Sequence, residues 1–206
     1  MVIREAKKTD LHKIVDIHIK AFPGFFMTKL GKGFLREYYF TVLAYNLNIF
    51  LVAEDENENR VVAFVAGFLK PSSFYLFLKK RCLKLALAIF LEILKSPGLI
   101  SRVIQNYQRV NKNISQNEEK TVELASIAVD PEYSGKGIGK SLVNKFLSAA
   151  LALGAEKVIL STDAENNDKV NYFYKSLGFK LERTFYSNPG RLMNEYCFYL
   201  NDRSKT

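Results

Sequence analysis

The feature that most constrains the fold is a glycine-rich segment between an expected strand and an expected helix. The apolar run "TVELASIAV" at 121–129 is typical of a strand, and apolar residues recur at helical spacing over 138–153. Between them, "DPEYSGKG" brings Gly135 and Gly137 close to the start of that helix. Glycine lets a ligand approach backbone N–H groups, and a helix N-terminus carries a partial positive charge. The segment therefore predicts an anion-binding loop, and a turn that binds nothing is the alternative.

The spacing of the glycines can be compared with two common phosphate-binding patterns. A P-loop has a glycine five residues before its Gly-Lys-Ser end, but the residue five before Gly139 is Ser134. The dinucleotide pattern G-x-G-x-x-G also fails, because the glycines at 135, 137 and 139 alternate. A P-loop kinase is therefore disfavoured and is kept only as a rival hypothesis.

Composition and element order indicate one globular domain of mixed α/β class. The chain has 206 residues, of which 48% are hydrophobic and 25% charged, enough for a single core. The pattern predicts an antiparallel hairpin toward each end of the chain. The expected strands are 2–6, 48–55, 60–70, 121–129, 157–162, 179–186 and 194–200, and the expected helices are 10–22, 34–46, 138–153 and 167–177.

The formal charge of +9 is concentrated in one segment. Residues 70–110 contain eight basic residues and one acidic residue, while the rest of the chain is nearly neutral. The pattern there predicts two helices broken at 96–98, within an insertion at about 71–118. Three roles stay open: a lid over a substrate cleft, a dimer face, or contact of residues 74–110 with a membrane surface. Nucleic acid is not an expected partner, because aliphatic rather than exposed aromatic side chains separate the bases.

The N-terminus and the cysteines bear on the cellular compartment. "MVIREAKKTD" has charges throughout, so no signal peptide is expected, and no apolar run is long enough to cross a bilayer. Cys82 and Cys197 match no zinc spacing, which favours two reduced cysteines and no metal site. We expect a cytoplasmic protein, either a monomer or a homodimer.

Two motifs carry a resemblance to a known family. The first is "IAVDPEYSGKGIG", with Val129-Asp-Pro131 followed by glycines at 135, 137 and 139. The second is "NDKVNYFYKSLGF", with Asn167, Val170, the aromatic pair at 173–174 and Gly-Phe at 178–179. Together they resemble the GNAT superfamily of N-acetyltransferases over 121–186, and the likeness is looser over the first seventy residues. Ser134 departs from the Gln or Arg that is usual in the family, and Lys136 or Lys140 would have to compensate.

The resemblance implies a fold, a reaction and a set of binding residues. The fold would be a central, mostly antiparallel sheet flanked by helices. The reaction would be transfer of an acetyl group from acetyl-CoA to a primary amine within a ternary complex. The residues that match the cofactor-binding positions are Ile127, Ala128, Val129, Ser134, Gly135, Lys136, Gly137, Ile138, Gly139, Lys140, Asn167 and Tyr174.

The same resemblance suggests roles for a few side chains. Tyr174 matches the usual general acid and would protonate the leaving thiolate. Glu123 matches a catalytic base found in one branch of the family, and strand alternation would place it on one face with Ala125 and Ile127. Asp163 is the second candidate for the base, and a water chain without a side-chain base is the alternative.

Other expected contacts are less specific. The resemblance also implies that a backbone N–H near Ile127 would meet the oxyanion, where the strand separates from its neighbour. Asn167 would bond the cofactor arm, cap the following helix, or do both. His18 is either structural or a substrate-side residue.

The acceptor amine is not identified by any motif. The basic segment favours an amino sugar, in particular one linked to a nucleotide or lipid, because the linking phosphates need positive charge. A protein N-terminus or another small amine is the alternative, and polyamines are disfavoured because a cationic surface repels them. A rival of a different class is a non-catalytic acyl-CoA sensor or a membrane-associated binding module.

Overall fold

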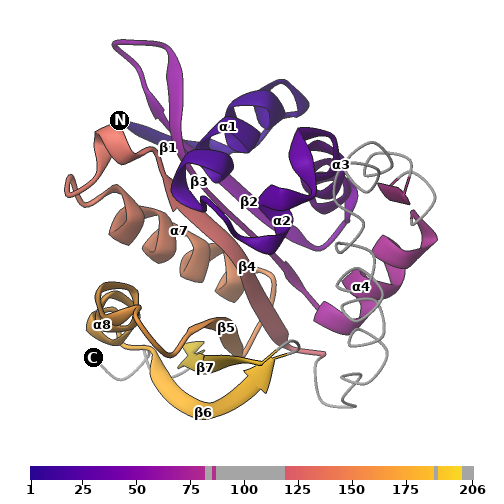
Figure 1. Cartoon of the computed structure of the whole chain (residues 1–206), viewed down its shortest axis with the longest axis vertical. Coiled ribbons are helices and arrows are strands. Elements are labelled where there is room, and N and C mark those ends of the chain that lie inside the picture. Colours follow the sequence, from indigo (N-terminus) through magenta and orange to yellow (C-terminus); the bar gives the residue numbers. More distant parts are fainter. Residues whose placement is uncertain (82–84, 87–118, 188–189, 201–206) are drawn as a thin grey trace.

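The computed structural model describes residues 1–81, 85–86, 119–187 and 190–200. In these residues, seven strands form one sheet in the order β1-β2-β3-β4-β5-β7-β6 (Figure 1). All neighbouring strands are antiparallel except β4 and β5. The strands are β1 (Val2–Glu5), β2 (Asn48–Asp55), β3 (Arg60–Leu69), β4 (Thr121–Val129), β5 (Lys157–Asp163), β6 (Lys180–Ser187) and β7 (Arg191–Tyr199). The predicted mixed, mostly antiparallel α/β fold is confirmed.

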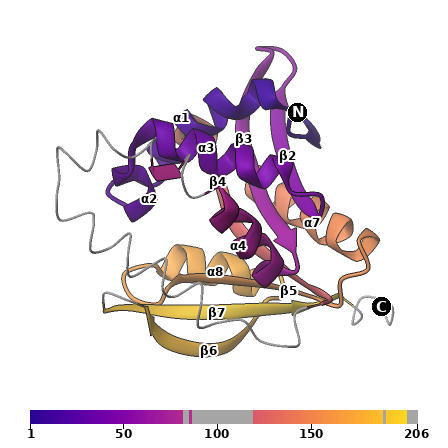
Figure 2. The same cartoon turned by 90° about the vertical axis from the view of Figure 1, so that its right-hand side faces the viewer.

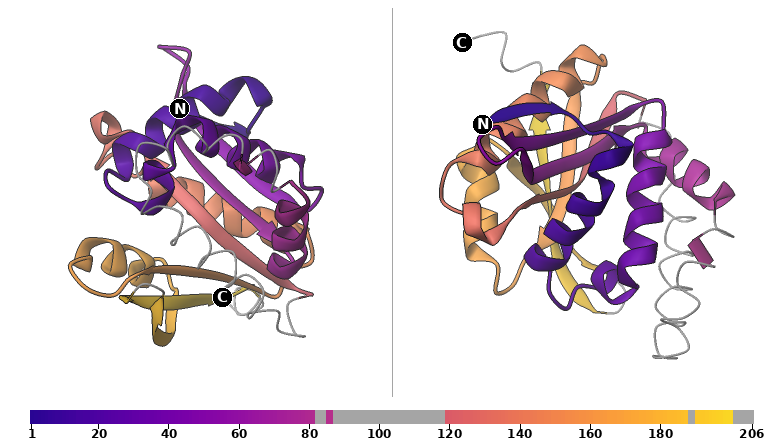
Figure 3. Two further views of the ribbon diagram at one scale, coloured as in Figure 1. Left: turned by 45° about the vertical axis from the view of Figure 1, so that its right-hand side comes forward. Right: turned by 90° about the horizontal axis from the view of Figure 1, so that it is seen from above.

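Helices cover both faces of the sheet. They are α1 (Leu11–Ala21), α2 (Phe26–Lys29), α3 (Gly31–Ala44), α4 (Pro71–Lys80), α7 (Ile138–Ala152) and α8 (Asp168–Ser176). Helices α1 and α3 lie on one face of β2–β4 and α7 lies on the other (Figure 3, right). Two apolar clusters result, one under α1 and α3 and one under α7, because alternate residues of β2 and β3 point to opposite faces.

Three expected boundaries differ from the structure. The segment 23–33, expected to be a break, contains α2, and α3 begins at Gly31 because a φ of +87° lets the chain turn into the helix there. Strand β7 begins at Arg191, which pairs with Ser187, so the final hairpin turn is shorter than expected. Helix α4 lies at the start of the predicted insertion, while most of its two predicted helices, with their break at 96–98, lies outside the described residues.

Strands β4 and β5 separate shortly after they meet. Their parallel pairing covers three residue pairs and ends at Glu123 opposite Ile159. Beyond that point β4 pairs only with β3, and β5 continues alongside β7 (Figures 1 and 2). Among the described residues, no strand therefore pairs with this edge of the last six residues of β4, 124–129. This open edge offers unpaired backbone groups to a ligand.

A β-bulge in β4 changes which side chains face which layer. Ala66 lies opposite Ser126 but Gly67 lies opposite Leu124, so Ala125 is an extra residue. Glu123 and Ala125 share a face, as expected, and that face is the α1–α3 side, whereas Ile127 packs with the α7 cluster. The predicted common face of Glu123 and Ile127 is therefore wrong, because the bulge reverses the alternation between them.

Gly67 makes this bulge sterically possible. A Cβ at position 67 would overlap the carbonyl oxygen of Glu123 and lie 2.5 Å from Cζ of Phe146. We expect Gly67→Ala to lower the free energy of unfolding by about 1–3 kcal/mol, the usual cost of overpacking a core. Thermal unfolding measures the loss. Gly139→Ala is the control, because its Cβ would lie 3.6 Å from Phe173, an ordinary contact. An unchanged melting temperature for Gly67→Ala would contradict this steric account.

Candidate active site

The glycine loop presents a row of unused backbone N–H groups at the start of α7. Gly135 and Gly137 both have φ of +76°, a conformation that other residues rarely adopt. The N–H of Ser134 donates to the carbonyl of Pro131, but none of the N–H groups of 135–140 has a partner among the described residues. Six adjacent donors at the N-terminus of a 15-residue helix form a cradle for an anion. This arrangement of donors suits the predicted anion-binding role, which stays a prediction.

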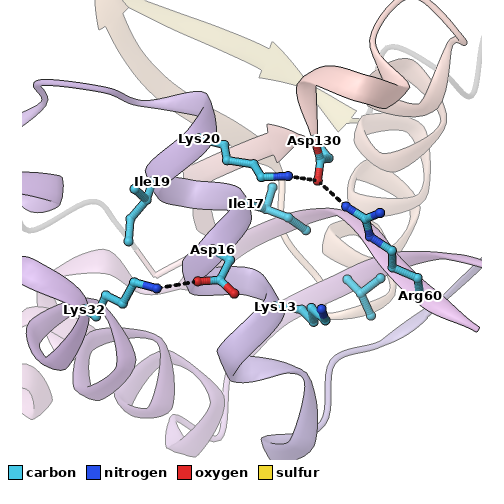
Figure 4. A pocket seen from close by; sticks show the side chains of 9 residues that line it. Lys13, Asp16, Ile17, Ile19, Lys20, Lys32, Arg60 and Asp130 are labelled. Carbon is cyan, nitrogen blue, oxygen red and sulfur yellow. Dashed lines mark hydrogen bonds and ion pairs between the residues drawn. The ribbon is translucent and has the colours of Figure 1, made fainter.

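The loop is anchored at its first residue, Asp130. Nζ of Lys20 and Nη2 of Arg60 each donate to Oδ2 of Asp130 at 2.9 Å, as Figure 4 shows. Oδ1 accepts from the backbone N–H of Glu132, which starts the turn into the loop. The side chain of Asp130 is 3% exposed. Burial opposes its ionisation, but these hydrogen bonds and the two cations outweigh it and hold the pKa of Asp130 below its usual value.

We expect Asp130→Asn to loosen this anchor without unfolding the protein. The free energy of unfolding should fall by about 1–3 kcal/mol, as for loss of charge-assisted hydrogen bonds, and acetyl-CoA affinity should fall several-fold. Because the folded-state pKa lies below the unfolded one, the stabilisation is complete at neutral pH. It disappears as pH falls below about 4, so the variant and the parent should converge in acid.

Asp16→Asn is the matched control for that change. Asp16 pairs with Lys32 in the same hollow of about 290 Å³, but this pair is exposed. Its loss should cost no more than about 0.5–1 kcal/mol. Thermal unfolding between pH 3 and pH 8 and calorimetric titration with acetyl-CoA measure both effects. Equal effects of the two substitutions would contradict an anchoring role for Asp130.

Glu123 stands where β4 and β5 separate. Its Oε1 accepts a hydrogen bond of 2.8 Å from the hydroxyl of Tyr75 on α4. Burial, together with the charge of this carboxylate, raises the pKa of Tyr38 on α3 well above its usual value. The candidate base therefore lies on the α1–α3 side of the sheet, opposite the layer of α7.

Tyr174 lies on α8 within the cluster under α7. It is 6% exposed, and its hydroxyl has no hydrogen-bond partner among the described residues. Burial raises the pKa of Tyr174 well above its usual value, so the phenol stays protonated. The preceding Phe173 packs within 3.6 Å of the Cβ position of Gly139. This contact places α8 directly against the glycine loop.

Asn167 occupies the N-cap position of α8 but makes no capping bond with its side chain. Its Nδ2 instead donates to Oγ1 of Thr162 at 2.8 Å and to the carbonyl of Asp163 at 3.1 Å. The side-chain cap, one of the two roles predicted for Asn167, is therefore wrong: a cap would need Oδ1 to accept an N–H of α8, and the two bonds from Nδ2 hold the amide group toward the end of β5 instead. The Oδ1 of Asn167 has no partner among the described residues and can accept a bond from a ligand.

Asn171 is a structural residue that the motifs did not reveal. Its Nδ2 donates to the carbonyls of Asp163 and Asn167, and its Oδ1 accepts from Nδ2 of Asn194 and from the hydroxyl of Tyr196. One side chain thus joins α8 to β5 and β7. In the sequence, only its spacing of four residues from Asn167, which places both side chains on one face of the helix, could have indicated this role.

Asp163, the second candidate for the base, is held in an ion pair. Arg191 donates to it from Nε at 2.9 Å and from Nη2 at 2.5 Å. The same guanidinium lies over the ring of Phe25, 5.2 Å from its centroid. The guanidinium of Arg191 therefore occupies both carboxylate oxygens of Asp163.

His18 is buried and belongs to a polar chain. It is 4% exposed, its Nδ1 lies 2.7 Å from the hydroxyl of Tyr39, and that hydroxyl lies 3.0 Å from Oγ of Ser126. Burial lowers the pKa of His18 to about 4, so the ring is neutral at pH 7. Sequence reasoning singled out His18 but missed Tyr39 and Ser126, which lie far away in the chain.

The remaining residues predicted to bind the cofactor lie on β4, in the glycine loop and at the start of α7. Residues 127–129 lie on the open edge of β4, and Ile138 is the first residue of α7. Lys136 lies over the ring of Tyr133, 4.5 Å from its centroid, and Lys140 is exposed.

Cys197 is free and buried, and Cys82 lies outside the described residues. No helix in the described part of the chain is long and apolar enough to cross a membrane.

Comparison with known proteins identifies the family. The profile of the acetyltransferase (GNAT) family matches residues 11–179. The chain belongs to this family. An uncharacterised N-acetyltransferase of Methanocaldococcus jannaschii is 41% identical over 68 residues, which are 32% of this chain and 30% of that protein. Human N-acetylaspartate synthetase is 38% identical over 66 residues, which are 32% of this chain and 22% of that protein.

Solved structures of the family show the same fold. The protein yncA of Salmonella typhimurium, solved with its cofactor acetyl-CoA, superposes with a TM-score of 0.59 at 16% identity. The superposition covers 97% of this chain and 94% of that one. The curated relatives match less of their length: this chain spans less than a third of each of the two named above.

Proposed function

We propose that this protein is an acetyl-CoA-dependent N-acetyltransferase that acetylates the primary amine of a small molecule within a ternary complex. The row of six unused N–H groups at 135–140, beside the open edge of β4, carries the proposal. A pyrophosphate needs several donors at once, and the open edge suits the amide-containing arm that follows it. Family membership supports the same co-substrate.

The residues of the loop and of α8 would hold acetyl-CoA. The N–H groups of 135–140 would bind its pyrophosphate, with Lys136 and Lys140 in place of the usual Gln or Arg at position 134. The open edge at 127–129 would pair with the arm, and Oδ1 of Asn167 would accept from an amide N–H. The thioester supplies the activated acetyl group, and a backbone N–H near Ile127 would stabilise negative charge that develops on its carbonyl oxygen.

Proton transfer would be divided between the two faces of the sheet. Glu123, on the α1–α3 side, would take a proton from the acceptor ammonium or through a water. Tyr174, on the α7–α8 side, would donate its phenolic proton to the departing thiolate. After attack the nitrogen carries a second surplus proton, which would pass to the Tyr174 phenolate as the thiol leaves, so that the turnover ends with one proton on Glu123 to be released to solvent.

For the acceptor we propose an amino sugar, including nucleotide-linked forms, with a small amino acid as the second candidate. The eight basic residues of 70–110 support the first, since sugar-linked phosphates need cations. The human relative, whose name gives N-acetylaspartate as its product, supports the second. The rival of a different class is a non-catalytic acyl-CoA sensor. We also propose that the enzyme acts in the cytoplasm.

Calorimetric titration with acetyl-CoA, with ATP as the control, tests the proposal. We expect micromolar binding of acetyl-CoA and none of ATP. Amino sugars, amino acids and polyamines are then tested as acceptors, and acetyl transfer to each is measured by the release of free thiol from acetyl-CoA. Binding of ATP alone would support the P-loop rival. Binding of acetyl-CoA without acetylation of any amine would support the sensor.

A further inference from the structure

A chain of three polar side chains runs from the open part of β4 into the protein. Ser126 on β4 is followed by the hydroxyl of Tyr39 on α3, and then by Nδ1 of His18 on α1. Tyr39 is fully buried and packs edge-on against Tyr38 and Phe64, which fixes its ring. The three groups come from separate elements, so the chain is a product of the fold rather than of local sequence.

The far end of the chain sets the direction of its hydrogen bonds. Nε2 of His18 is buried and has no partner among the described residues. A buried N–H without a partner is costlier and rarer than an unpartnered lone pair, so we assign the proton of the neutral ring to Nδ1. Nδ1–H then donates to the oxygen of Tyr39, and the Tyr39 O–H must donate to Oγ of Ser126.

With the hydrogen bonds directed from His18 to Tyr39 to Ser126, the hydroxyl proton of Ser126 is available for a bond to a ligand. Its oxygen is already an acceptor for Tyr39, and no other partner of Ser126 occurs among the described residues. Ser126 is partly exposed and follows the bulge residue Ala125, beyond the last pairing of β4 with β5. A hydroxyl on a partly exposed residue, whose oxygen already accepts from the buried Tyr39, has its proton free to donate to a ligand.

Ser126 lies on the face of β4 from which the acceptor amine would approach. The glycine loop leads into α7, so acetyl-CoA would approach from the α7 side. Ser126 and Glu123 point to the other side, toward α1, α3 and α4. An amine that reaches Glu123 would therefore meet the hydroxyl of Ser126 three residues further along the strand.

We propose that Ser126 is a specificity-determining residue whose hydroxyl donates a hydrogen bond to an oxygen atom next to the reacting amine. The inference rests on the proposed acetyltransferase function. It favours acceptors with a hydroxyl or a carboxylate beside the amine, as in amino sugars and amino acids. Polyamines carry no oxygen and leave the Ser126 proton unpaired. A site built to pair such a group discriminates strongly against an analogue that lacks it.

Matched pairs of amines test this discrimination. The probes are glucosamine against cyclohexylamine for a hydroxyl, and glycine against ethylamine for a carboxylate. With the parent protein we expect kcat/KM to favour the oxygen-bearing member of at least one pair by tenfold or more. The pair that shows the preference tells which oxygen is recognised. In Ser126→Ala the preference should fall about tenfold, and Ser126→Thr, which keeps the hydroxyl, should restore most of it.

Tyr39→Phe separates orientation of the hydroxyl from its mere presence. It retains the ring but leaves Ser126 without its donor, so the preference should fall to a value between those of the parent and Ser126→Ala. Acetyl-CoA affinity, measured by calorimetry, should stay within about twofold in all three variants. Unchanged discrimination in Ser126→Ala, with acetyl-CoA still bound, would overturn the inference alone. Failure of the parent to bind acetyl-CoA would overturn the proposed function and the inference together.

The tautomer of His18 gives a test that needs no acceptor. Nitrogen-15 NMR of the histidine side chains, with His12→Gln to simplify assignment, reports which ring nitrogen carries the proton. We expect the Nδ1–H form at pH 7. The Nε2–H form would reverse the chain, make Ser126 the donor to Tyr39, and overturn the inference.

Discussion

Tyr174→Phe should lower the acetyl-transfer turnover number by a factor of about 10²–10⁴, the usual contribution of a positioned general acid. The substitution removes only the hydroxyl, and the ring contacts of Tyr174 with Phe173, Phe179 and Tyr196 stay in place. Acetyl-CoA affinity should therefore stay within about twofold. Steady-state kinetics and calorimetric titration of the same preparation separate the two quantities.

The loss should be the same at every pH from 6 to 9. An acid must hold its proton to act, and burial raises the pKa of Tyr174 well above the usual value for a phenol. Tyr174 therefore stays protonated through this range and contributes no falling limb to the pH–rate profile. Tyr172→Phe on the same helix is the matched control, because Tyr172 is 74% exposed, and its kinetics should not change. If turnover in Tyr174→Phe stayed within twofold of the parent, water rather than Tyr174 would be the donor of the proton to the leaving thiolate.

The parts of the site that could be predicted from sequence are local ones. The glycine loop lies within ten residues, so its strand, its positive-φ glycines and the start of α7 can all be recognised in one stretch. Tyr174 and Asn167 belong to one short helix for the same reason. Their chemistry follows from residue type and spacing, with no need to know what packs around them.

The parts that could not be predicted depend on contacts between distant segments. Asn171 makes hydrogen bonds to β5 and β7, and nothing in its neighbours indicates these partners. Ser126 and Tyr39 are 87 residues apart, so the hydrogen bond between their hydroxyls cannot be recognised in the sequence.

The face of Glu123 relative to Ile127 illustrates the same limit. Strict alternation along β4 places both side chains on one face, and this prediction failed. The cause is the bulge at Ala125, whose position is set by the close approach of Gly67 on the neighbouring strand. Register is a property of two strands, so one strand read by itself cannot reveal it.

Gly137→Ala should lower acetyl-CoA affinity by at least about tenfold, or 1.4 kcal/mol of binding free energy. Gly137 is the N-cap of α7, and its φ of +76° exposes the N–H groups that follow it. A methyl group there meets no atom of the protein within 4 Å, so it projects into the space through which a phosphate must approach. The conformation itself also becomes strained by about 1–2 kcal/mol.

Gly154→Ala separates this strain from the effect on binding. Gly154 lies just beyond the other end of α7, has a φ of +77°, and its Cβ would likewise meet nothing within 4 Å. Both variants should therefore lose similar stability in thermal unfolding. Only Gly137→Ala should lose affinity for acetyl-CoA in calorimetric titration. If the two variants bind equally well, the row of N–H groups at 135–140 does not hold the pyrophosphate. The open edge of β4 would then have to bind the co-substrate without the loop. A single strand edge can bind a peptide in this way, but it does not supply the cluster of donors that a doubly charged anion needs.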